Sequence, residues 1–197
     1  MTSAVREVRR SQIIAAARTI VAQQGLAALT FSSLEAELEF TRGVITYHFK
    51  NKDAIVDAVL ASALDEIDGA TLAAVQARGT PTERLAAAVR ATIAGFIENI
   101  EAGRILLAFW ARINTDPAAR ERNARLYATY RGRVTVLLRE GVDAGEFLVD
   151  DEPGTATFVV GTIIGVVTQE YFDPGHVAWR GAADRAAVLV VASVAAS

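Results

Sequence analysis

The segment Thr41–Lys52, TRGVITYHFKNK, says more about the fold than any other part of this 197-residue chain. It holds both lysines of the protein, Lys50 and Lys52, and every other Lys or Arg position is an arginine. It begins with a hydroxyl, an arginine and a glycine. Such a helix start offers free N–H groups and a cation to phosphate and lets the backbone approach closely. The segment therefore predicts a short helix that binds a polyanion.

The sequence before this segment completes a recognisable supersecondary pattern. An apolar-periodic helix is predicted over residues 5–24, with Gly25 as its C-terminal stop, and a second short helix over residues 32–38. The order helix, short helix, turn, short helix is how a helix-turn-helix reader of the DNA major groove is built. We expect a domain boundary near residue 50.

The rest of the chain also repeats its apolar residues at a helical period, without useful strand alternation. Asn51 is expected to cap a helix that runs towards Gly79, and Pro81 suits a first helical position. Further helices are expected over residues 81–103, 104–114, 117 to the loop at 145–154, 155–172 and 179–195. The sequence thus predicts an all-α protein of about nine helices, with a three-helix N-terminal domain.

The charge of the chain is unevenly distributed. The net charge is −3. Residues 1–52 carry seven Arg or Lys against four Glu, a net of +3, and residues 53–197 carry thirteen against nineteen, a net of −6. A basic N-terminal quarter on an acidic body is what an electrostatic footprint for phosphates looks like.

Composition favours a soluble cytoplasmic protein. Hydrophobic residues make up 52% of the chain and cysteine is absent, so a helical globule in a reducing compartment fits best. Glu7 and Arg18 interrupt any signal-peptide core. The apolar run over residues 158–167 is half the ~20 residues that a membrane-spanning helix needs.

No motif for catalysis or for a cofactor is found. The chain lacks Gly-x-Ser-x-Gly, a phosphate-binding loop, His-Glu-x-x-His and any cysteine nucleophile. The acidic run Asp150–Glu152 lacks the alternating spacing of a calcium loop. We expect no catalytic residue, no cofactor and no metal. Two alternatives remain open: an all-helical small-molecule-binding protein or enzyme without DNA binding, and a helix-turn-helix protein that retains only its dimer.

Residues 10–60 resemble the DNA-binding domain of TetR-family transcriptional regulators. The resemblance lies in TFSSL at 30–34, FTRGVI at 40–45 and YHFKNKD at 47–53. The remainder, with LLAFW at 106–110, Asp116-Pro117 and the arginine-rich helix after it, is similar to the BetI-type C-terminal domain. The chain departs from the family pattern at Glu39, where glycine is usual, and at Thr46, where the first of two aromatic residues is usual.

The resemblance implies a homodimer that binds a palindromic operator in double-stranded DNA. Residues 1–50 would be the DNA-binding domain, and residues 51–197 would bind a small-molecule effector and dimerise. Lys50 is expected to anchor phosphate, and Arg42 to contact guanine or phosphate. The candidate DNA contacts are Thr30, Ser32, Ser33, Thr41, Arg42, Gly43, Val44, Thr46, Tyr47, His48, Lys50 and Lys52. Simpler interpretations exist, since Ser32 and Glu35 also form a possible capping box and a lone histidine is often packed.

Aromatic and polar residues on helices expected to face one another form the candidate effector site. They suit a cationic ligand or an apolar one equally, and an aromatic stripe is also typical of a core. These residues are Phe96, Phe109, Trp110, Arg112, Tyr127, Tyr130 and Gln169.

The two closing helices carry the candidate dimer contacts. Gly161 and Gly165 stand one helical turn apart, and Val188 and Val191 belong to an apolar last helix. Two such helices from each subunit would form an isologous four-helix interface. Burial inside the monomer is the alternative.

Overall fold

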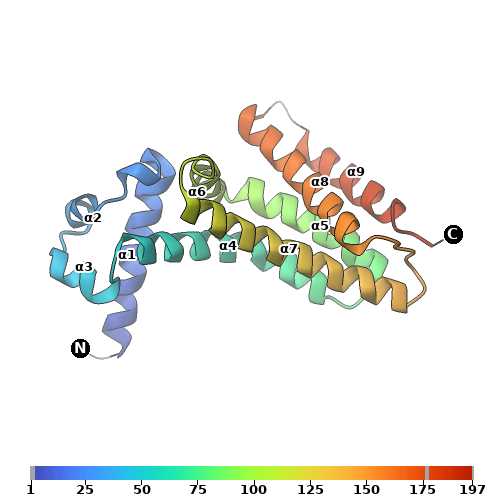
Figure 1. Ribbon diagram of the computed structural model, residues 1–197, viewed down its shortest axis with the longest axis horizontal. Helices are drawn as coiled ribbons and strands as arrows, with labels where there is room; N and C mark the ends of the chain where they lie inside the picture. Colours follow the sequence, from blue (N-terminus) through green and yellow to red (C-terminus); the bar gives the residue numbers. More distant parts are fainter. Residues whose placement is uncertain (1–2, 176–177, 197) are drawn as a thin grey trace. The chain divides into compact units, whose positions relative to one another are not determined.

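The computed structural model describes residues 3–175 and 178–196, and these form nine α-helices, as expected, with one 3-10 turn (Figure 1). No helix within the described ranges combines the length and apolarity needed to cross a bilayer. The elements are α1 (Ser3–Gln24), η1 (Leu26–Ala28), α2 (Phe31–Leu38), α3 (Arg42–His48), α4 (Lys52–Gln76), α5 (Pro81–Glu98), α6 (Ile100–Trp110), α7 (Pro117–Asp143), α8 (Glu152–Phe172) and α9 (Trp179–Ala192).

The chain forms two compact units that do not follow a single cut in the sequence. The first contains Met1–Glu66 and Ile100–Arg120, and the second contains Ile67–Asn99 and Glu121–Ser197. The first unit therefore includes α6 in addition to the N-terminal helices. The domain boundary near residue 50 expected from the sequence stays a prediction.

In the first unit α1 contacts α2, α3 and α6. Gly25 ends α1 with a φ of 82°, in the position predicted from the sequence. The core between the first three helices is aliphatic apart from one ring, since a small helical domain is stabilised mainly by burial of one apolar face per helix. Its buried side chains include Ile13, Ala17, Ile20, Val21, Leu34, Ile45 and Phe49.

The start of α2 differs from the prediction. The helix begins at Phe31, so its cap is Thr30, whose backbone is extended (φ −135°). The Thr30 hydroxyl accepts a hydrogen bond from the Ser33 N–H at 3.0 Å, and Ser33 Oγ accepts one from the Thr30 N–H at 2.9 Å. The predicted capping box of Ser32 and Glu35 is wrong because Ser32 already lies inside the first turn.

The turn between α2 and α3 is left-handed at Glu39. This residue has φ 53° and ψ 24° and is the only non-glycine residue with positive φ in the described chain. Its side chain is exposed. Thr41 then stands at the cap position of α3, as predicted, but its hydroxyl accepts no hydrogen bond from the first turn. The free N–H groups at the start of α3 are therefore not used by the cap side chain.

Three later helix starts follow the sequence prediction. Asn51 Oδ1 accepts a hydrogen bond from the Ala54 N–H at 2.9 Å and caps α4. Pro81 opens α5, where Thr80 and Glu83 form a capping box. Asp116 Oδ1 accepts from the Ala118 N–H at 3.0 Å at the start of α7. Each start has a short polar side chain that accepts from an unpaired N–H.

The end of α5 was predicted wrongly. The sequence suggested a helix that reaches Gly103, but α5 ends at Glu98 and Gly103 is buried inside α6. Asn99 leaves the helical conformation (φ −93°, ψ 71°), and its Nδ2 donates to the Gly95 carbonyl at 2.7 Å. An asparagine side chain that takes a backbone carbonyl in this way competes with the helical ladder.

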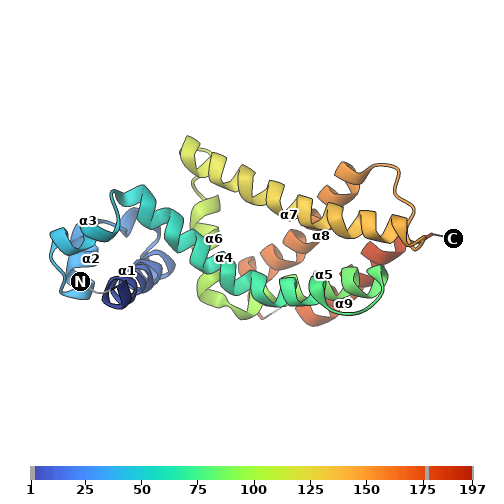
Figure 2. The same ribbon diagram turned by 90° about the horizontal axis from the view of Figure 1, so that it is seen from below.

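In the second unit α5 lies beside α8 and α9, which also contact each other (Figure 1 and Figure 2). Gly95 allows α5 to approach α4 closely, because a Cβ at this position would lie 2.6 Å from the Ile67 carbonyl oxygen. The core is formed from one face of each helix. Its buried side chains include Leu85, Val89, Ile93, Phe96, Leu137, Leu138, Val159, Ile163, Val167, Ala187 and Val190.

Replacing Glu39 by glycine should stabilise the protein. A residue with a Cβ in the left-handed region costs about 1 kcal/mol, and glycine removes this cost. We expect Glu39→Gly to raise the free energy of unfolding by about 1 kcal/mol in urea titrations. The matched control is Glu37→Gly, an exposed position inside α2, which should lose about 1 kcal/mol. A loss in both variants would show that the turn does not store this strain.

Candidate nucleic-acid interface and ligand cavity

Helix α3 presents one exposed face above a buried one. Arg42, Gly43, Thr46 and Tyr47 are exposed, and Tyr47 keeps 61% of its surface. Ile45 on the opposite side is fully buried. The Thr46 hydroxyl donates to the Arg42 carbonyl at 3.0 Å, so its proton is used within the helix. The exposed face is rich in groups that bind bases and phosphates.

The other predicted contact residues frame this face. Thr41 and Ser32 are exposed, and Val44 is half-buried. The hydroxyl groups of Thr30 and Ser33 are engaged in the cap of α2. Lys50, immediately after α3, is exposed, and Lys52, at the start of α4, is half-buried. The first unit therefore gathers the predicted set around the α2–α3 turn and the two ends of α3.

Four arginines stack on aromatic rings in the same region, and three of them were not among the residues predicted from the sequence. Those three belong to the first turns of α1, and their spacing of three and one residues, which places them on one helix face, was the available signal. Stacking on a ring holds a guanidinium in place while its N–H edges stay accessible. The pairs are Arg6 on Tyr47 (5.7 Å), Arg9 on Phe40 (5.0 Å), Arg10 on Phe49 (4.5 Å) and Arg42 on Phe31 (5.0 Å).

His48 is packed and not turned towards solvent. Both ring nitrogens are buried, without a hydrogen-bond partner among the described residues, and the ring packs edge-on against Tyr47 at 5.1 Å. Burial first, and then the charges of Arg6, Arg10 and Arg9, lower the pKa of His48. A neutral imidazole adds no charge, so the positive charge of this surface comes from its arginines and lysines.

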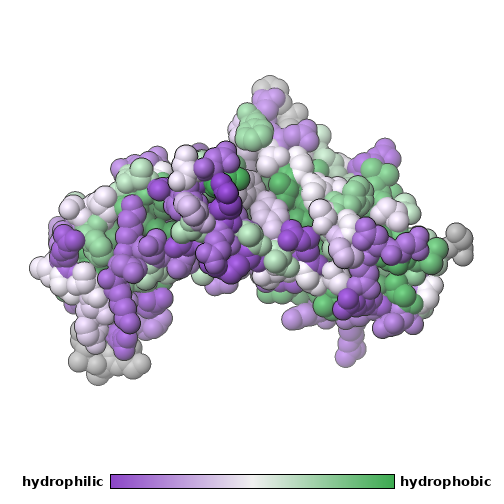
Figure 3. Space-filling model, in the orientation of Figure 1, coloured by the Kyte–Doolittle hydropathy of each residue, from purple (hydrophilic) through white to green (hydrophobic). Residues whose placement is uncertain are grey.

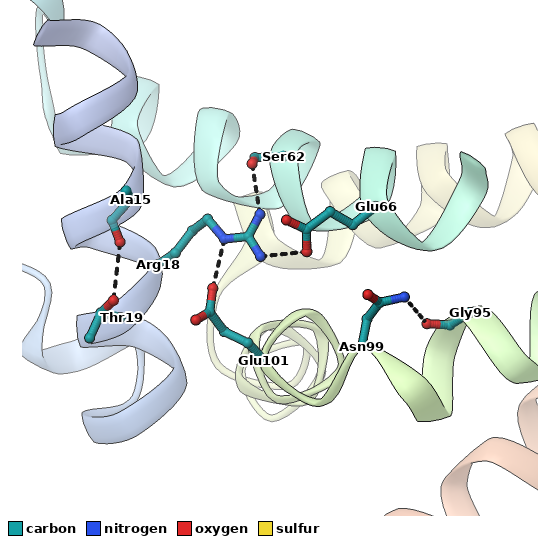
Figure 4. A network of polar contacts seen from close by, with 8 residues as sticks. All are labelled: Ala15, Arg18, Thr19, Ser62, Glu66, Gly95, Asn99 and Glu101. Carbon is teal, nitrogen blue, oxygen red and sulfur yellow. Dashed lines mark hydrogen bonds and ion pairs between the residues drawn. The ribbon is translucent and has the colours of Figure 1, made fainter. Parts of the chain in front are cut away.

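Arg18 of α1 is the centre of a polar cluster within the first unit (Figure 4). It donates from Nη2 to Glu66 Oε2 at 2.7 Å, from Nε to Glu101 Oε1 at 2.8 Å, and from Nη1 to Ser62 Oγ at 2.8 Å. Burial tends to lower the pKa of Arg18, but the two carboxylates raise it overall. The guanidinium stays charged and ties α1 to both α4 and α6.

The second unit contains a cavity between α4, α5, α7 and α8. The volume open to the centres of water molecules is about 90 Å³. This is enough for several water molecules or a small organic molecule, because one water centre needs only about 10–15 Å³. Most of its wall is aliphatic or aromatic, including Leu85, Val89, Phe96, Leu137, Val160 and Ile163. Such an apolar space with few polar groups is typical of a small-molecule site.

The polar residues of the cavity wall are few and mostly paired. Asp68, only 8% exposed, accepts a hydrogen bond from Arg133 Nη1 at 2.5 Å. Thr71 and Thr92 share a hydrogen bond of 3.0 Å, and Thr92 also donates to the Ala88 carbonyl. Neither Asp68 nor Arg133 was predicted, because the ion pair joins positions 65 residues apart and leaves no local signal.

Two of the seven predicted effector residues, Phe96 and Tyr130, line this cavity. The other five do not line it. Phe109, Trp110 and Arg112 belong to the first unit, where Arg112 pairs with Asp116 at 3.4 Å. Tyr127 packs edge-on against Tyr130 at 6.4 Å, and Gln169 Nε2 donates to the Gly165 carbonyl at 3.0 Å.

Both parts of the chain match known families. Residues 13–59 match the bacterial regulatory proteins of the tetR family, and residues 81–196 match the C-terminal part of BetI-type transcriptional repressors. The regulator BetI of Burkholderia cenocepacia is 30% identical over 114 residues, which are 57% of this chain. The alignment spans 59% of the length of that relative.

Solved structures share the fold. A protein of Saccharomonospora viridis in complex with choline superposes with a TM-score of 0.75 at 18% identity, over 97% of this chain and 100% of the other. The complex of SmeT with triclosan superposes with a TM-score of 0.80 at 20% identity, over 96% and 93%. At these identities the likeness concerns the fold.

Removing one carboxylate from the Arg18 cluster should destabilise the protein. Glu101→Gln keeps the side-chain shape but leaves the buried guanidinium with one charged partner. Because Glu101 is half-exposed, we expect a loss of only about 1 kcal/mol in the free energy of unfolding. The control is Glu121→Gln, which breaks an exposed pair with Arg125 and should cost less than about 0.5 kcal/mol. Equal losses would remove any special role for Arg18.

Proposed function

Because the chain belongs to the tetR family of bacterial regulatory proteins, with a BetI-type C-terminal part, we propose that it is a transcriptional repressor and not an enzyme. It binds a palindromic operator as a homodimer in the cytoplasm and leaves it when a small molecule binds. The observation that carries this proposal is the exposed Arg42–Tyr47 face of α3 above the buried Ile45, surrounded by basic residues.

In this proposal residues 1–50 read the DNA and residues 51–197 bind the effector and dimerise. Arg42, Thr46 and Tyr47 face base edges in the major groove. Lys50 and Lys52 bind phosphates at the exit of α3, and the ring-stacked Arg6 adds a further phosphate contact. Neutral His48 lies behind this face and supports Tyr47.

The homodimer forms through α8 and α9. Gly161 and Val188 are exposed in the single chain, and Val188 keeps 55% of its surface. This exposure speaks against the alternative that both residues are buried inside the monomer. No neighbouring atom lies within 4 Å of a Cβ placed on Gly161 or Gly165, so a partner helix has room to approach. Val191 on α9 is half-buried. Figure 3 shows hydrophobic residues at the surface of the second unit. The exposed large apolar side chains on α8 and α9 include Phe158, Phe172, Val188 and Leu189.

The effector binds in the cavity of the second unit. Two proteins of this fold hold choline and triclosan, a quaternary ammonium ion and a chlorinated phenol, so the fold is compatible with ligands of different chemistry. In the free dimer the two α3 helices stand about 34–36 Å apart, at successive major grooves. A ligand that favours another arrangement of α4 changes this spacing. The free energy by which it shifts the equilibrium between the two arrangements equals the difference in its binding free energy for them.

The test is an unbiased selection of duplexes from a random oligonucleotide pool with the purified protein. We expect a symmetric sequence whose affinity falls steeply with salt, because Arg and Lys displace counterions from phosphates. Absence of any salt-sensitive preference would refute the proposal. It would favour an all-helical small-molecule-binding protein without DNA binding.

Replacing Lys50 should weaken binding to all duplexes by the same factor. A phosphate contact carries no sequence information, so Lys50→Ala should lower the slope of log K against log salt by about 0.9 per subunit. The control is Arg42→Ala, which should change the selected sequence in addition to the affinity. Fluorescence anisotropy at several salt concentrations measures the affinity and the salt slope of each variant, and a repeated duplex selection measures the sequence preference of Arg42→Ala. An unchanged slope for Lys50→Ala would remove this residue from the contact set.

A charge on α9 should dissociate the dimer. Val188→Asp places a carboxylate in the proposed apolar interface, where it has no partner. We expect a dimer for the wild-type protein and a monomer for the variant in sedimentation equilibrium. Val136→Asp is the control, because Val136 on α7 is equally exposed, at 53%, but lies outside the proposed interface. A monomeric wild-type protein at micromolar concentration would contradict the dimer.

A further inference from the structure

Two buried polar atoms in the wall of the second unit's cavity form no hydrogen bond of ordinary geometry with the described residues. One is Asp68 Oδ1, whose sister oxygen is bound by Arg133. The other is the hydroxyl of Tyr130. Both residues line the cavity, and Asp68 is more than nine-tenths buried. A buried polar atom without a partner is costly, so this corner of the cavity is built to receive a hydrogen-bonding group.

The two atoms complement each other. A carboxylate oxygen only accepts hydrogen bonds, whereas a phenol both donates and accepts. Burial, then the charge of Asp68 and a hydrogen-bonding approach to its carboxylate, raise the pKa of Tyr130, so its O–H proton is present at neutral pH. A hydroxyl group placed between them donates to Asp68 Oδ1 and accepts from Tyr130. An alkyl group at the same place would leave each of the two atoms only the approach of the other.

The charge of the wall argues against an ionic ligand. Asp68 and Arg133 are the charged side chains among the described residues of the lining, and their charges cancel. A cation would therefore add an unbalanced positive charge to an otherwise apolar space, and an anion an unbalanced negative one. The Arg133 guanidinium also lies 5.7 Å from the Tyr130 ring centre, so this ring already has a cationic neighbour.

We propose that the cavity selects a small, neutral and mainly apolar molecule with one hydroxyl group, held between Asp68 Oδ1 and the Tyr130 hydroxyl. The apolar part lies against Phe96, Leu137 and Ile163. This ligand class rests on the proposed function, in which the same cavity holds the effector. It differs from choline, the ligand of the Saccharomonospora viridis protein, because choline carries a permanent charge.

Three probes of nearly equal size separate the possibilities: benzyl alcohol, ethylbenzene and benzylammonium. They place a hydroxyl, a methyl and an ammonium group at the same position of one skeleton. Isothermal titration calorimetry on the full chain without DNA measures each affinity. The alcohol should bind at least about tenfold more tightly than the ammonium ion, because the neutral alcohol leaves the charge of the wall balanced and the cation does not. Tighter binding of the ammonium ion, or no binding of the alcohol, overturns the proposal.

Tyr130→Phe removes the hydroxyl and keeps the ring. It should weaken the alcohol about tenfold, the loss of one buried hydrogen bond, and change ethylbenzene by less than about twofold. The matched control is Tyr127→Phe, which removes a hydroxyl outside the cavity and should change neither affinity. Thermal melts verify that both variants fold. Equal weakening of alcohol and hydrocarbon by Tyr130→Phe means that Tyr130 only shapes the cavity, and this also overturns the proposal.

A second measurement separates this inference from the proposed function. The alcohol is added to the complex of the protein with its selected duplex. If the alcohol binds as expected but leaves the duplex bound, the ligand class stands and the release mechanism fails. If the duplex selection itself fails while calorimetry gives the expected order, the cavity serves a protein that does not bind DNA.

Discussion

A helix of seven residues is not stable in water on its own, because the cost of the first turn is recovered only over a longer ladder. Helix α3 therefore exists through the burial of Ile45, and of Phe49 just after it, against α1 and α2. The left-handed Glu39 sets the direction in which α3 leaves α2. Everything attributed to the exposed face of α3 depends on this buried face being held in place.

The buried charged residue has the opposite sign in the two units, and the number of its ion-pair partners also differs. In the first unit the buried group is a cation, Arg18, matched by the half-exposed Glu66 and Glu101. In the second unit it is an anion, Asp68, which forms an ion pair with Arg133. The first cluster satisfies every nitrogen of its guanidinium and therefore fixes the geometry of α1, α4 and α6. The second leaves Asp68 Oδ1, in the wall of the cavity, without a hydrogen bond of ordinary geometry to the described residues. The first cluster connects three helices, and the second lies in the cavity that we propose as the ligand site.

Helix number, most helix starts and the position of α3 could be predicted from the sequence because they depend on local features. Asn51 and Pro81 illustrate this, since capping and proline geometry act over a few residues. The cap at Thr30 and the break at Asn99 were missed because neighbouring side chains compete for the same backbone groups. The cavity could not be predicted, because Asp68 and Arg133 meet only after α4 and α7 have packed. Of the predicted aromatic residues, only Phe96 and Tyr130 reach it.

The placement of the lysines has a practical consequence for handling this protein. Since Lys50 and Lys52 are its only lysines, reagents selective for primary amines modify no side chain outside the exit of α3. Coupling to a sensor chip through these amines would cover the surface that we propose to bind DNA. Dye labelling by the same chemistry would neutralise both charges at once. Immobilisation through an introduced cysteine avoids this, because the natural sequence contains no thiol.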